Sequence, residues 1–442
     1  MSKIVKLKDV CYLITKGTTP TTVGGQFVDS GINFIKSESI CESKFLNSSV
    51  FAYIDNETDI KLKRSRLAKD DLLFSIAGAY LGKIGIVREK DLPANTNQAV
   101  GIVRLKKHIV DVDFVFYFFS QKHINEYINK LSSQSSQPNL NLELLGKLEF
   151  ELKDISTQKQ ISSILSSLDS KIELNNRINA ELETMAKTMY NYWFVQFDFP
   201  NVEGKPYKSS GGKMVWNEEL KREMPEGWKV GTLLDIANVI GGSTPSKEIS
   251  EYFVTDGTAW ITPKDLSMNT GNKFITKGEI DVSEKGLKAA SLNIMPKGTV
   301  LLSSRAPIGY MAISRGLVTT NQGFKSFVPK QGYTTPFVYY TVKNSIPTII
   351  NNASGSTFKE VSGSVLKTIT TCLPTGVIIE KFSKIVDPIF EKQNIIEHEN
   401  QQLSSLRDWL LPMLMNGQVK VGEVEEVGGL MAAEPGEEYK KQ

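Results

Sequence analysis

The chain of 442 residues lacks any hydrophobic run approaching the roughly 20 residues that a membrane-spanning helix requires. It has only three cysteines, and this odd, scattered set predicts free thiols in a reducing compartment instead of a disulfide framework. The N-terminus has neither a sustained apolar stretch nor a small-residue cleavage site, which argues against a signal peptide. We therefore expect a cytoplasmic protein without membrane segments.

Motifs for catalysis are also missing. His108, His123 and His398 are isolated from one another and lack the set of Cys, Asp or Glu residues at ligand spacing that a metal site requires. No G-x-G-x-x-G follows a predicted strand, so no dinucleotide or S-adenosylmethionine cradle is expected. Gly78-x-x-x-Gly82-Lys83 is one residue short of a phosphate-binding loop and lacks the following hydroxyl residue, so a glycine turn is expected. Asp387-Pro388-Ile389-Phe390 faintly resembles a DNA aminomethyltransferase motif, but it lies on a helical pattern with Ile389 as a core position.

What the sequence does contain is a long internal repeat. The offset between the two copies changes only slowly, as insertions and deletions in loops would produce. A repeat this long indicates two copies of a whole domain and not a solenoid. The matching segments are Gly17-Thr18-Thr19-Pro20 with Gly242-Ser243-Thr244-Pro245, Leu72-Leu73-Phe74-Ser75 with Val300-Leu301-Leu302-Ser303, Asn97-Gln98 with Asn321-Gln322, and Phe114-Val115-Phe116-Tyr117 with Phe337-Val338-Tyr339-Tyr340.

Each copy has the composition of a mixed α/β domain. Short β-branched and apolar runs alternate with Gly, Asn, Ser and Pro, a pattern that predicts strands joined by polar loops. One aromatic-rich helical patch is expected in each copy, near 112–131 and 335–350. The fold class predicted from these features is α+β, with two duplicated mixed α/β domains.

The segments after each copy have the pattern of long helices. Apolar residues recur at spacings of three and four over 155–196 and 376–416. A narrow apolar seam on so long a helix requires a partner, and the duplication favours an antiparallel coiled coil with pseudo-two-fold symmetry. Thr157-x-x-Gln160 predicts a capping box, Pro412 predicts a kink or an end, and Asn416-Gly417 predicts a helix stop.

These patterns give a division of the chain into six parts. We expect a first domain at 1–153, a first, central helix at 154–200, a linker at 201–224, a second domain at 225–374, a second, distal helix at 375–418 and an acidic disordered tail at 419–442.

Net charge gives a weak indication of the partner. The formal net charge is +3, and residues 421–442 contribute 2 − 6 = −4, which leaves +7 for the remainder. A mildly basic body permits nucleic-acid binding without demonstrating it.

Four further segments carry a family resemblance. They are Leu406-Arg407-Asp408-Trp409-Leu410-Leu411-Pro412-Met413-Leu414-Met415-Asn416-Gly417-Gln418-Val419, Tyr192-Trp193-Phe194-Val195-Gln196-Phe197-Asp198-Phe199, Met224-Pro225-Glu226-Gly227-Trp228 and Gly355-Ser356-Thr357-Phe358-Lys359-Glu360. Together with the duplication, they make the chain resemble the specificity subunit of type I DNA restriction-modification systems. The resemblance extends to about residue 422.

The resemblance implies a function in DNA recognition. Each domain would be a target recognition domain that reads one part of a split, asymmetric sequence in double-stranded DNA. The helices would set the distance between the parts and dock two methyltransferase subunits, which bring S-adenosylmethionine and methylate adenine N6. Motor-nuclease subunits would add cleavage driven by ATP with magnesium. The chain itself would bind no cofactor and catalyse no reaction.

One segment differs between the copies. The first has Ser135-Ser136-Gln137-Pro138-Asn139-Leu140 where the second has Gly355-Ser356-Thr357-Phe358-Lys359-Glu360. The two halves are therefore expected to read different bases.

Candidate DNA contacts lie in the polar loops, because hydroxyls and amides hold phosphates while Lys, Arg, Asn and Gln read base edges. Tight turns, surface charges and turn caps are the alternative interpretations of these residues, and Asn97-Gln98 and Asn321-Gln322 could either bond adenine bidentately or cap a turn. The expected contacts are Lys16, Thr18, Thr19, Lys36, Ser37, Lys83, Asn97 and Gln98 in the first domain, and Ser243, Thr244, Lys264, Asp265, Arg305, Asn321, Gln322 and Lys359 in the second.

Two other functions compete with this reading. The chain could be the recognition portion of a self-contained restriction-methylation enzyme, although it lacks methyltransferase motifs. It could also be a purely structural coiled-coil adaptor, although that would not explain the paired loop-rich domains. The aromatic residues at the domain junctions, Trp193, Phe194, Phe197, Trp228 and Trp409, are interpreted as packing residues in preference to partner or base contacts.

Overall fold

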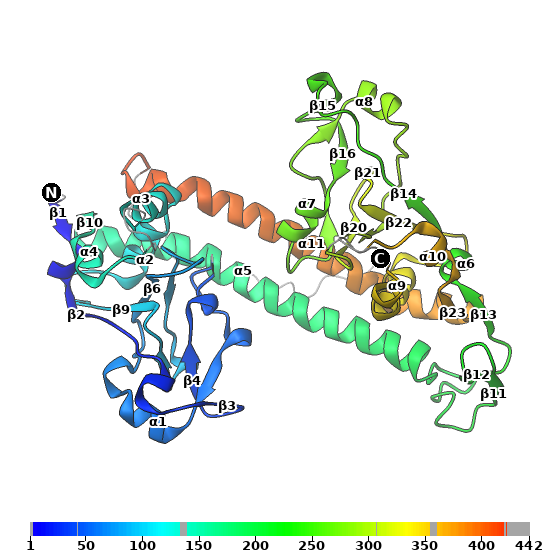
Figure 1. Cartoon of the computed structure of the whole chain (residues 1–442), viewed down its shortest axis with the longest axis horizontal. Coiled ribbons are helices and arrows are strands. Elements are labelled where there is room, and N and C mark those ends of the chain that lie inside the picture. The colour runs from blue at the N-terminus through cyan, green and yellow to red at the C-terminus, as the bar shows by residue number, and fades with distance from the viewer. Residues whose placement is uncertain are drawn as a thin grey trace, which may run out of the picture. The chain divides into compact units, whose positions relative to one another are not determined.

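The computed structural model describes residues 3–41, 43–132, 139–305, 307–353, 360–419 and 421. The chain divides into two compact units, one made of residues 1–173 and 402–442 and the other of residues 174–401. Each unit combines a globular domain with part of two long helices (Figure 1). Lys359 and all but one residue of the expected tail beyond 419 lie outside the described residues.

The globular part of the first unit contains two four-stranded sheets. Their orders are β2-β9-β6-β7 and β3-β5-β4-β8, and only β4 and β8 pair in parallel. The strands are β2 (Cys11–Lys16), β3 (Phe27–Val28), β4 (Ile32–Ile35), β5 (Ala52–Ile54), β6 (Leu72–Ser75), β7 (Ile84–Ile86), β8 (Ala94–Thr96) and β9 (Val100–Leu105), and a ribbon joins β1 (Lys3–Lys6) to β10 (Glu149–Leu152). Helices α1 (Asn56–Lys61), α2 (Val112–Ser120), α3 (Lys122–Ser132) and α4 (Leu142–Lys147) complete it.

The local sequence explains the central elements of this domain. All four residues of β6 are buried, as expected of an inner strand covered on both faces, where apolar residues run without alternation. Helix α2 begins after Asp111, whose carboxylate accepts a hydrogen bond from the Phe114 backbone N–H. The helix then places its aromatic side chains in the main core of the unit.

The second unit repeats this topology with one extra strand. Its sheets have the orders β14-β22-β19-β20-β17 and β15-β18-β16-β21, and β16 pairs with β21 in parallel as β4 does with β8. The strands are β14 (Ala237–Gly241), β15 (Phe253–Val254), β16 (Thr258–Ile261), β17 (Phe274–Ile275), β18 (Asp281–Val282), β19 (Val300–Ser303), β20 (Met311–Ser314), β21 (Val318–Thr320) and β22 (Phe324–Pro329). A ribbon pairs β13 (Lys229–Thr232) with β23 (Thr370–Leu373), and the helices are α6 (Leu233–Ile236), α7 (Pro263–Met268), α8 (Glu284–Ala289), α9 (Thr335–Asn351) and α10 (Gly363–Thr368).

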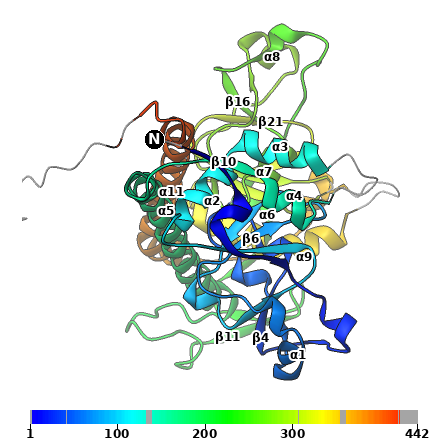
Figure 2. The same cartoon turned by 90° about the vertical axis from the view of Figure 1, so that its left-hand side faces the viewer.

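The two long helices are α5 (Ile155–Tyr190) and α11 (Gly376–Met415), and they run side by side (Figures 1 and 2). Within the second unit, Asn175 Nδ2 lies 2.8 Å from Glu399 Oε2, while Gln393 Nε2 lies 3.2 Å from the Asn179 carbonyl oxygen. Advancing along α5 therefore means going back along α11. This confirms the α+β fold class with two duplicated domains and an antiparallel coiled coil.

One of the predicted helix signals was wrong. The cap of α5 is Asp154, which accepts bonds from the Thr157 backbone N–H at 2.9 Å and from its hydroxyl at 2.6 Å, so Thr157 is not the first residue of a capping box. Pro412 lies in the last turn of α11, which ends at Met415, and Leu411, Leu414 and Met415 are buried in the core of the first unit. Gly417 has φ 71° at the helix end, as its sequence predicts.

The segment expected as a linker is structured. Strands β11 (Met214–Asn217) and β12 (Arg222–Pro225) form an antiparallel ribbon. The Tyr207 ring stacks on Phe199 with 4.7 Å between ring centroids, and it packs against the core of the second unit. The sequence concealed this because the segment is polar and rich in glycine. Its few apolar residues nevertheless pack against the core of the second unit, as Tyr207 does.

Candidate nucleic-acid interface

The candidate loops of the first unit emerge at one edge of its sheets. Lys16 ends β2, and Lys36 and Ser37 follow β4. The Asn97-Gln98 turn joins β8 to β9, and Lys83 precedes β7. The strand pairings bring these points together, because Lys16 pairs with Gly101, Ile35 pairs with Thr96, and Ser75 pairs with Val100. Side chains more than 60 positions apart in the chain therefore share one edge.

The second unit has the same arrangement. Gly241 pairs with Lys325 at the end of β14, Ile261 pairs with Thr320, and Ser303 pairs with Phe324. The loops after β14, β16 and β19 consequently meet at the turn between β21 and β22. The segments after these strands contain Ser243 and Thr244, Lys264 and Asp265 in the first turn of α7, and Arg305, and the turn contains Asn321 and Gln322.

A glycine lets the loop after β2 lie directly against the β8–β9 turn. The Gly17 N–H donates to the Val100 carbonyl at 3.2 Å, and the Thr18 N–H donates to the Thr96 carbonyl at 3.1 Å. A Cβ atom on Gly17 would lie only 2.1 Å from the Thr96 carbonyl oxygen. Any larger residue would therefore push the two loops apart.

The two loops are also joined through side chains. The Thr19 hydroxyl donates to Gln98 Oε1, while the Gln98 side chain remains exposed. The Asn97 side chain folds back, so that its Oδ1 accepts from the Ala99 backbone N–H at 3.1 Å. Of the two alternatives for Asn97, the structure shows the turn cap.

The second unit repeats the backbone contact. The Ser243 N–H donates to the Thr320 carbonyl at 2.9 Å. A Cβ atom on Gly242 would lie 2.0 Å from the Asn321 carbonyl oxygen. The same close approach of two loops thus occurs in both units.

The side-chain contacts are repeated as well. The Thr244 hydroxyl donates to Oε1 of the exposed Gln322. Asn321 Oδ1 accepts from the Gly323 N–H at 2.9 Å, so Asn321 caps its turn as Asn97 does. We call the two arrangements, Thr19 with Gln98 and Thr244 with Gln322, the Thr–Gln pairs.

Beside the second Thr–Gln pair lies an open cavity of about 880 Å³. Its lining includes Thr244, Gln322, the Trp260 ring, and the two lysines Lys247 and Lys264. The Trp260 indole N–H donates to the Ser243 carbonyl at 3.1 Å, which fixes the ring in the wall. Lys247 was not predicted as a contact from the sequence, because it lies in none of the repeated motifs.

Lys264 and Asp265 have different parts in this cavity. Lys264 is exposed and pairs with Glu279 at 2.6 Å, and this hydrogen-bonded carboxylate raises the pKa of Lys264. Asp265 caps α7, with its Oδ2 accepting from the Thr262 N–H and its Oδ1 accepting from the Glu279 N–H at 2.9 Å. The Asp265 carboxylate is thus engaged in hydrogen bonds within the protein, because Asp265 is the third residue of α7 and Thr262 is the N-cap of that helix.

In the first unit the surroundings of the Thr–Gln pair are different. Arg64 Nη2 lies 3.4 Å from the Thr18 hydroxyl, which adds a guanidinium that sequence reasoning missed. Lys36 lies 3.8 Å from Glu38 and 4.8 Å from the centre of the Phe27 ring. Ser37 begins a short 3-10 turn, Ser37–Ser39.

Lys83 and Arg305 do not occupy equivalent positions. Arg305 forms an isolated β-bridge with Glu360, and its side chain pairs with that residue's carboxylate at 3.0 Å. The corresponding bridge in the first unit joins Ala77 to Asn139, so Arg305 corresponds to Ala77. Lys83 lies 5.4 Å from the centre of the Tyr80 ring.

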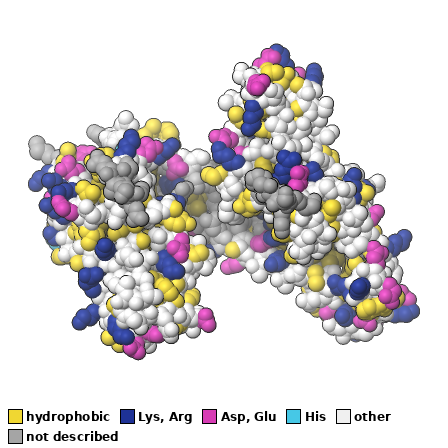
Figure 3. Space-filling view, in the orientation of Figure 1, with side chains coloured by type: hydrophobic (Ala, Val, Ile, Leu, Met, Phe, Trp, Pro, Cys, Tyr) yellow, Lys and Arg dark blue, Asp and Glu magenta, His cyan; other side chains and the backbone are white. Residues whose placement is uncertain are grey.

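Charge alone does not mark the interface. On the face shown in Figure 3, basic side chains in each unit are interspersed with acidic ones. Several candidate lysines and arginines also carry an acidic partner, as Lys36, Lys264 and Arg305 do. Loop geometry is therefore the stronger sign of the site.

Each globular domain is fastened to the long helices by equivalent basic residues. The backbone carbonyls of Lys44 and Lys273 accept from Ile86 and Ile313, which occupy the same position of β7 and β20. Lys44 Nζ lies 2.8 Å from Asp113 and 3.0 Å from Ser166 Oγ of α5. Lys273 Nζ lies 2.5 Å from Glu183 of α5 and 2.6 Å from Gln393 of α11.

Two arginines at equivalent positions also form ion pairs with the long helices. Arg88, two residues beyond Ile86, pairs with Glu173 of α5 at 2.6 Å. Arg315, two residues beyond Ile313, donates to Asn394 at 2.7 Å and pairs with Glu397 at 3.2 Å. None of these four basic residues was predicted from the sequence. The equivalent positions of Lys44 and Lys273, and of Arg88 and Arg315, in the two copies could have indicated them.

Most of the junction aromatics are packing residues. Trp193, Phe194, Phe197 and Trp228 are buried in the core of the second unit. Phe194 contacts Phe382 of α11 with 4.9 Å between ring centroids. Trp409 is different, because 56% of its surface is exposed.

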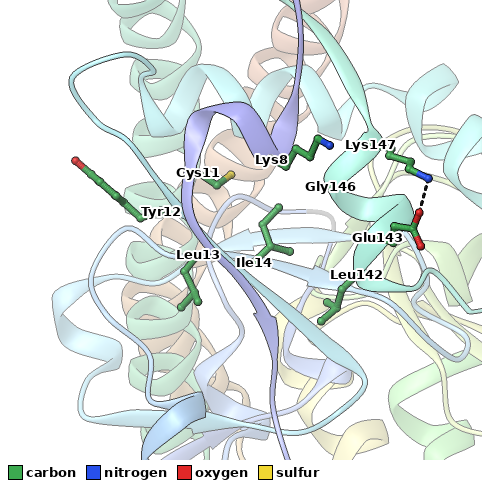
Figure 4. Close-up of a pocket in the computed structure, with 9 residues that line it drawn as sticks. All are labelled: Lys8, Cys11, Tyr12, Leu13, Ile14, Leu142, Glu143, Gly146 and Lys147. Atoms are coloured by element: carbon green, nitrogen blue, oxygen red, sulfur yellow. Dashed lines mark hydrogen bonds and ion pairs between the residues drawn. The ribbon is translucent and has the colours of Figure 1, made fainter.

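The first unit also has an open pocket of about 450 Å³ between β2 and α4 (Figure 4). Ile14 and Leu142 face each other across it, and Tyr12 points away on the other side of the strand. The Cys11 thiol donates to the Leu7 carbonyl at 2.8 Å, and burial raises the pKa of this thiol to about 12. A thiol held protonated is a poor nucleophile, so this pocket offers no reactive cysteine.

Within the described ranges, no group of three His, Cys, Asp or Glu side chains is arranged to hold a metal ion. No described helix is both long and apolar enough to span a membrane.

The duplicated domains, the antiparallel helices and the two loop clusters define a class of protein with two recognition modules. The sequence matches the type I restriction modification DNA specificity domain over residues 2–184 and 225–405. The chain therefore belongs to this family and carries two copies of its domain.

Individual relatives agree with this assignment. The MjaIX specificity subunit of a type I restriction enzyme from Methanocaldococcus jannaschii is 40% identical over 210 residues, which is 46% of this chain and 48% of that protein. The chain thus spans about half the length of this relative. The HindI specificity subunit from Haemophilus influenzae is 26% identical and covers 87% of this chain and 94% of its own length.

A solved structure shows the same fold. The S subunit of a type I restriction-modification system from M. genitalium superposes with a TM-score of 0.58 at 16% identity. The match covers 94% of this chain and 96% of that one.

Proposed function

We propose that this chain is the specificity subunit of a type I restriction-modification complex, in which each globular domain reads one part of a bipartite, asymmetric site in double-stranded DNA. The observation that carries this proposal is the repeated edge of loops. Both units gather Gly, Thr, Asn and Gln residues with basic side chains at one edge, and these are side chains that bind phosphates and base edges.

The two domains are proposed to read different sequences. The Thr–Gln pairs are alike in the two units, but their neighbours are not, with Arg64 beside one pair and Lys247 with Lys264 beside the other. Different side chains around a common frame would give two unlike half-sites, as an asymmetric target requires.

The helices are proposed to carry the domains and the partner subunits. Two methyltransferase subunits would dock on the chain and supply S-adenosylmethionine, and motor-nuclease subunits would use ATP and magnesium. In this proposal the chain itself binds no cofactor and has no catalytic role, because its sequence lacks methyltransferase motifs. The names of the relatives, which are specificity subunits of restriction enzymes, support this assignment.

The proposal is tested by co-expressing the chain with methyltransferase subunits and mapping methylated adenines in the host DNA. We expect one asymmetric motif of two specified parts separated by an unspecified spacer. Replacing residues 225–374 by the corresponding domain of a relative should change one part and leave the other unchanged. Loss of both parts, or a continuous motif, would contradict the proposal.

A second measurement separates recognition from catalysis. The purified chain alone, incubated with DNA and labelled S-adenosylmethionine, should transfer no label, and the complex should transfer it. Label transfer by the chain alone at a rate comparable to the complex would instead indicate a self-contained enzyme.

A further inference from the structure

The two Thr–Gln pairs are built alike although they belong to different units. In each, a glycine brings two loops into contact, a threonine hydroxyl donates to a glutamine Oε1, and an asparagine Oδ1 caps the turn next to that glutamine. A buried proline follows the threonine in both loops, at Pro20 and Pro245, and fixes the backbone there. The two pairs therefore share both their backbone contacts and their side-chain hydrogen bonds.

The surroundings of the pairs share much less. Arg64, from a separate segment, contacts Thr18 beside the first pair, and the second pair adjoins a cavity with Lys247, Lys264 and Trp260. The segment after β4 is a 3-10 turn, Ser37–Ser39, whereas the segment after β16 is the helix α7. Variation is therefore concentrated around the pairs and is small within them.

This contrast indicates what each part contacts. Two unlike half-sites have different base edges, but both have the same sugar–phosphate backbone. A feature identical in both units suits the part of the ligand that is identical in both half-sites. The features that vary suit the bases.

The chemistry of the pairs agrees with this division. A glutamine that reads adenine must present its oxygen and its amide nitrogen to one base edge. In both pairs the glutamine Oε1 already accepts a hydrogen bond from the threonine hydroxyl. This bond orients the amide group, so that its two N–H groups are the part of the side chain that can donate to a ligand. Phosphate oxygens only accept hydrogen bonds, so they match such a donor group.

We propose that the Thr19–Gln98 and Thr244–Gln322 pairs are phosphate-binding sites, one in each recognition domain. They hold the DNA backbone in register, and the side chains that differ between the units read the sequence. This inference rests on the proposed function, because it assigns a role to residues of the same interface. It differs from both alternatives that the sequence left open for Gln98 and Gln322, which were bonding to adenine and capping of a turn.

The test uses the full chain assembled with methyltransferase subunits and a duplex that contains the mapped site. Ethylation of individual phosphates is scored for interference with binding, for the wild type and for Gln98→Ala and Gln322→Ala. Each variant should lose interference at one or two phosphates in its own half-site only. The affinity should fall roughly 2- to 12-fold, as expected for one net hydrogen bond, for the mapped site and for unrelated DNA alike.

Methylation mapping, a second pair of variants and a folding control complete the test. The methylated motif of both variants should stay identical to that of the wild type. Thr19→Val and Thr244→Val keep the shape of the loop but remove the hydroxyl, so they should weaken the same phosphate contacts less than the alanine variants do. Unchanged thermal unfolding establishes that each variant is folded.

Relaxation of one base position in the motif of Gln98→Ala or Gln322→Ala would overturn the inference, because it would make the glutamine a base reader. An unchanged interference pattern with unchanged affinity would also overturn it. If the wild type itself shows no site-specific binding, the proposed function fails instead, and the two failures are thereby distinguished.

Discussion

Lys44 of the first unit and Lys273 of the second occupy equivalent positions, yet their surroundings differ. Lys44 is 9% exposed and pairs with Asp113 and with the neutral hydroxyl of Ser166. Lys273 is 5% exposed, pairs with Glu183 and lies 3.8 Å from the centre of the Phe390 ring. Both lysines are therefore buried, but Lys273 bonds to both long helices and lies against an aromatic ring, whereas Lys44 bonds to Ser166 of α5 and Asp113 of α2.

The buried attachment of the second unit joins both helices to its domain. Glu397 of α11 accepts hydrogen bonds from the backbone N–H groups of Lys273 and Phe274, at 2.8 and 2.9 Å. Burial raises the pKa of Glu397, although these donors and Arg315 act against the rise. Removing one partner from a buried pair leaves an uncompensated charge, which costs more than losing an exposed pair. The comparison teaches that equivalent positions need not contribute equally to stability.

The largest effect is expected from Glu183→Ala. It leaves Lys273 buried without its carboxylate, and we expect the free energy of unfolding of the second unit to fall by about 3–5 kcal/mol. The matched substitution in the first unit, Asp113→Ala, should cost less, about 1–3 kcal/mol, because Asp113 contacts Lys44 and Ser166, whereas Glu183 contacts Lys273, Lys343 and Tyr340. Urea denaturation of both variants, followed by tryptophan fluorescence and circular dichroism, measures the difference. Equal losses would remove the distinction between the two attachments.

A pH titration should show the same contrast. Burial, partly opposed by Glu183, lowers the pKa of Lys273 from 10.5 to about 8. The unfolded chain therefore binds more protons than the folded one between pH 8 and 10.5, and this lysine makes stability rise with pH across that window. The variant Lys273→Met should lack this contribution, and Lys44→Met should retain it. Urea midpoints at several pH values in the window provide the check, and equal slopes for wild type and Lys273→Met would contradict the assignment.

Glycine substitutions should affect the two units equally. A Cβ atom at Gly17 or Gly242 meets a backbone carbonyl at 2.1 or 2.0 Å, so Gly17→Ala and Gly242→Ala must separate the two loops. We expect each to cost about 1–3 kcal/mol, as overpacking does. The variant Gly316→Ala is the control, because nothing lies within 4 Å of its Cβ position. Thermal unfolding of the three variants decides whether the loop contact is equivalent in both units.

The smallest effect on stability is expected from Lys264→Ala. Its pair with Glu279 is exposed on both sides and screened by water, so we expect thermal unfolding to be almost unchanged. Lys285→Ala, which removes the exposed pair with Glu251, is the matched control for stability. Only Lys264→Ala should alter DNA recognition, and only in the half-site read by the second unit. Methylation mapping that shows the same motif for both variants would exclude Lys264 from base reading.

The sequence by itself determined the architecture of this protein. Matching segments such as Gly17-Thr18-Thr19-Pro20 and Gly242-Ser243-Thr244-Pro245 showed the duplication. The helical spacings over 155–196 and 376–416 predicted two long helices, which are observed as α5 and α11. These features are readable because periodicity and repetition are properties of the order of residues along the chain and do not depend on how the chain folds.

The tertiary structure decided which polar side chains serve the fold and which remain at the surface. Asn97 and Asn321 cap turns and Asp265 caps a helix, while Gln98 and Gln322 stay exposed. The roles of these residues depend on partners that only folding brings near.

The attachments to the helices depended on folding even more strongly. Lys273 meets Glu183 and Gln393 across 90 and 120 positions of the chain. A lysine that ends in a buried network and a lysine that ends in water look alike in a sequence. Only the packing of the domain against both helices determines which of them loses its water and therefore which charge must be paired.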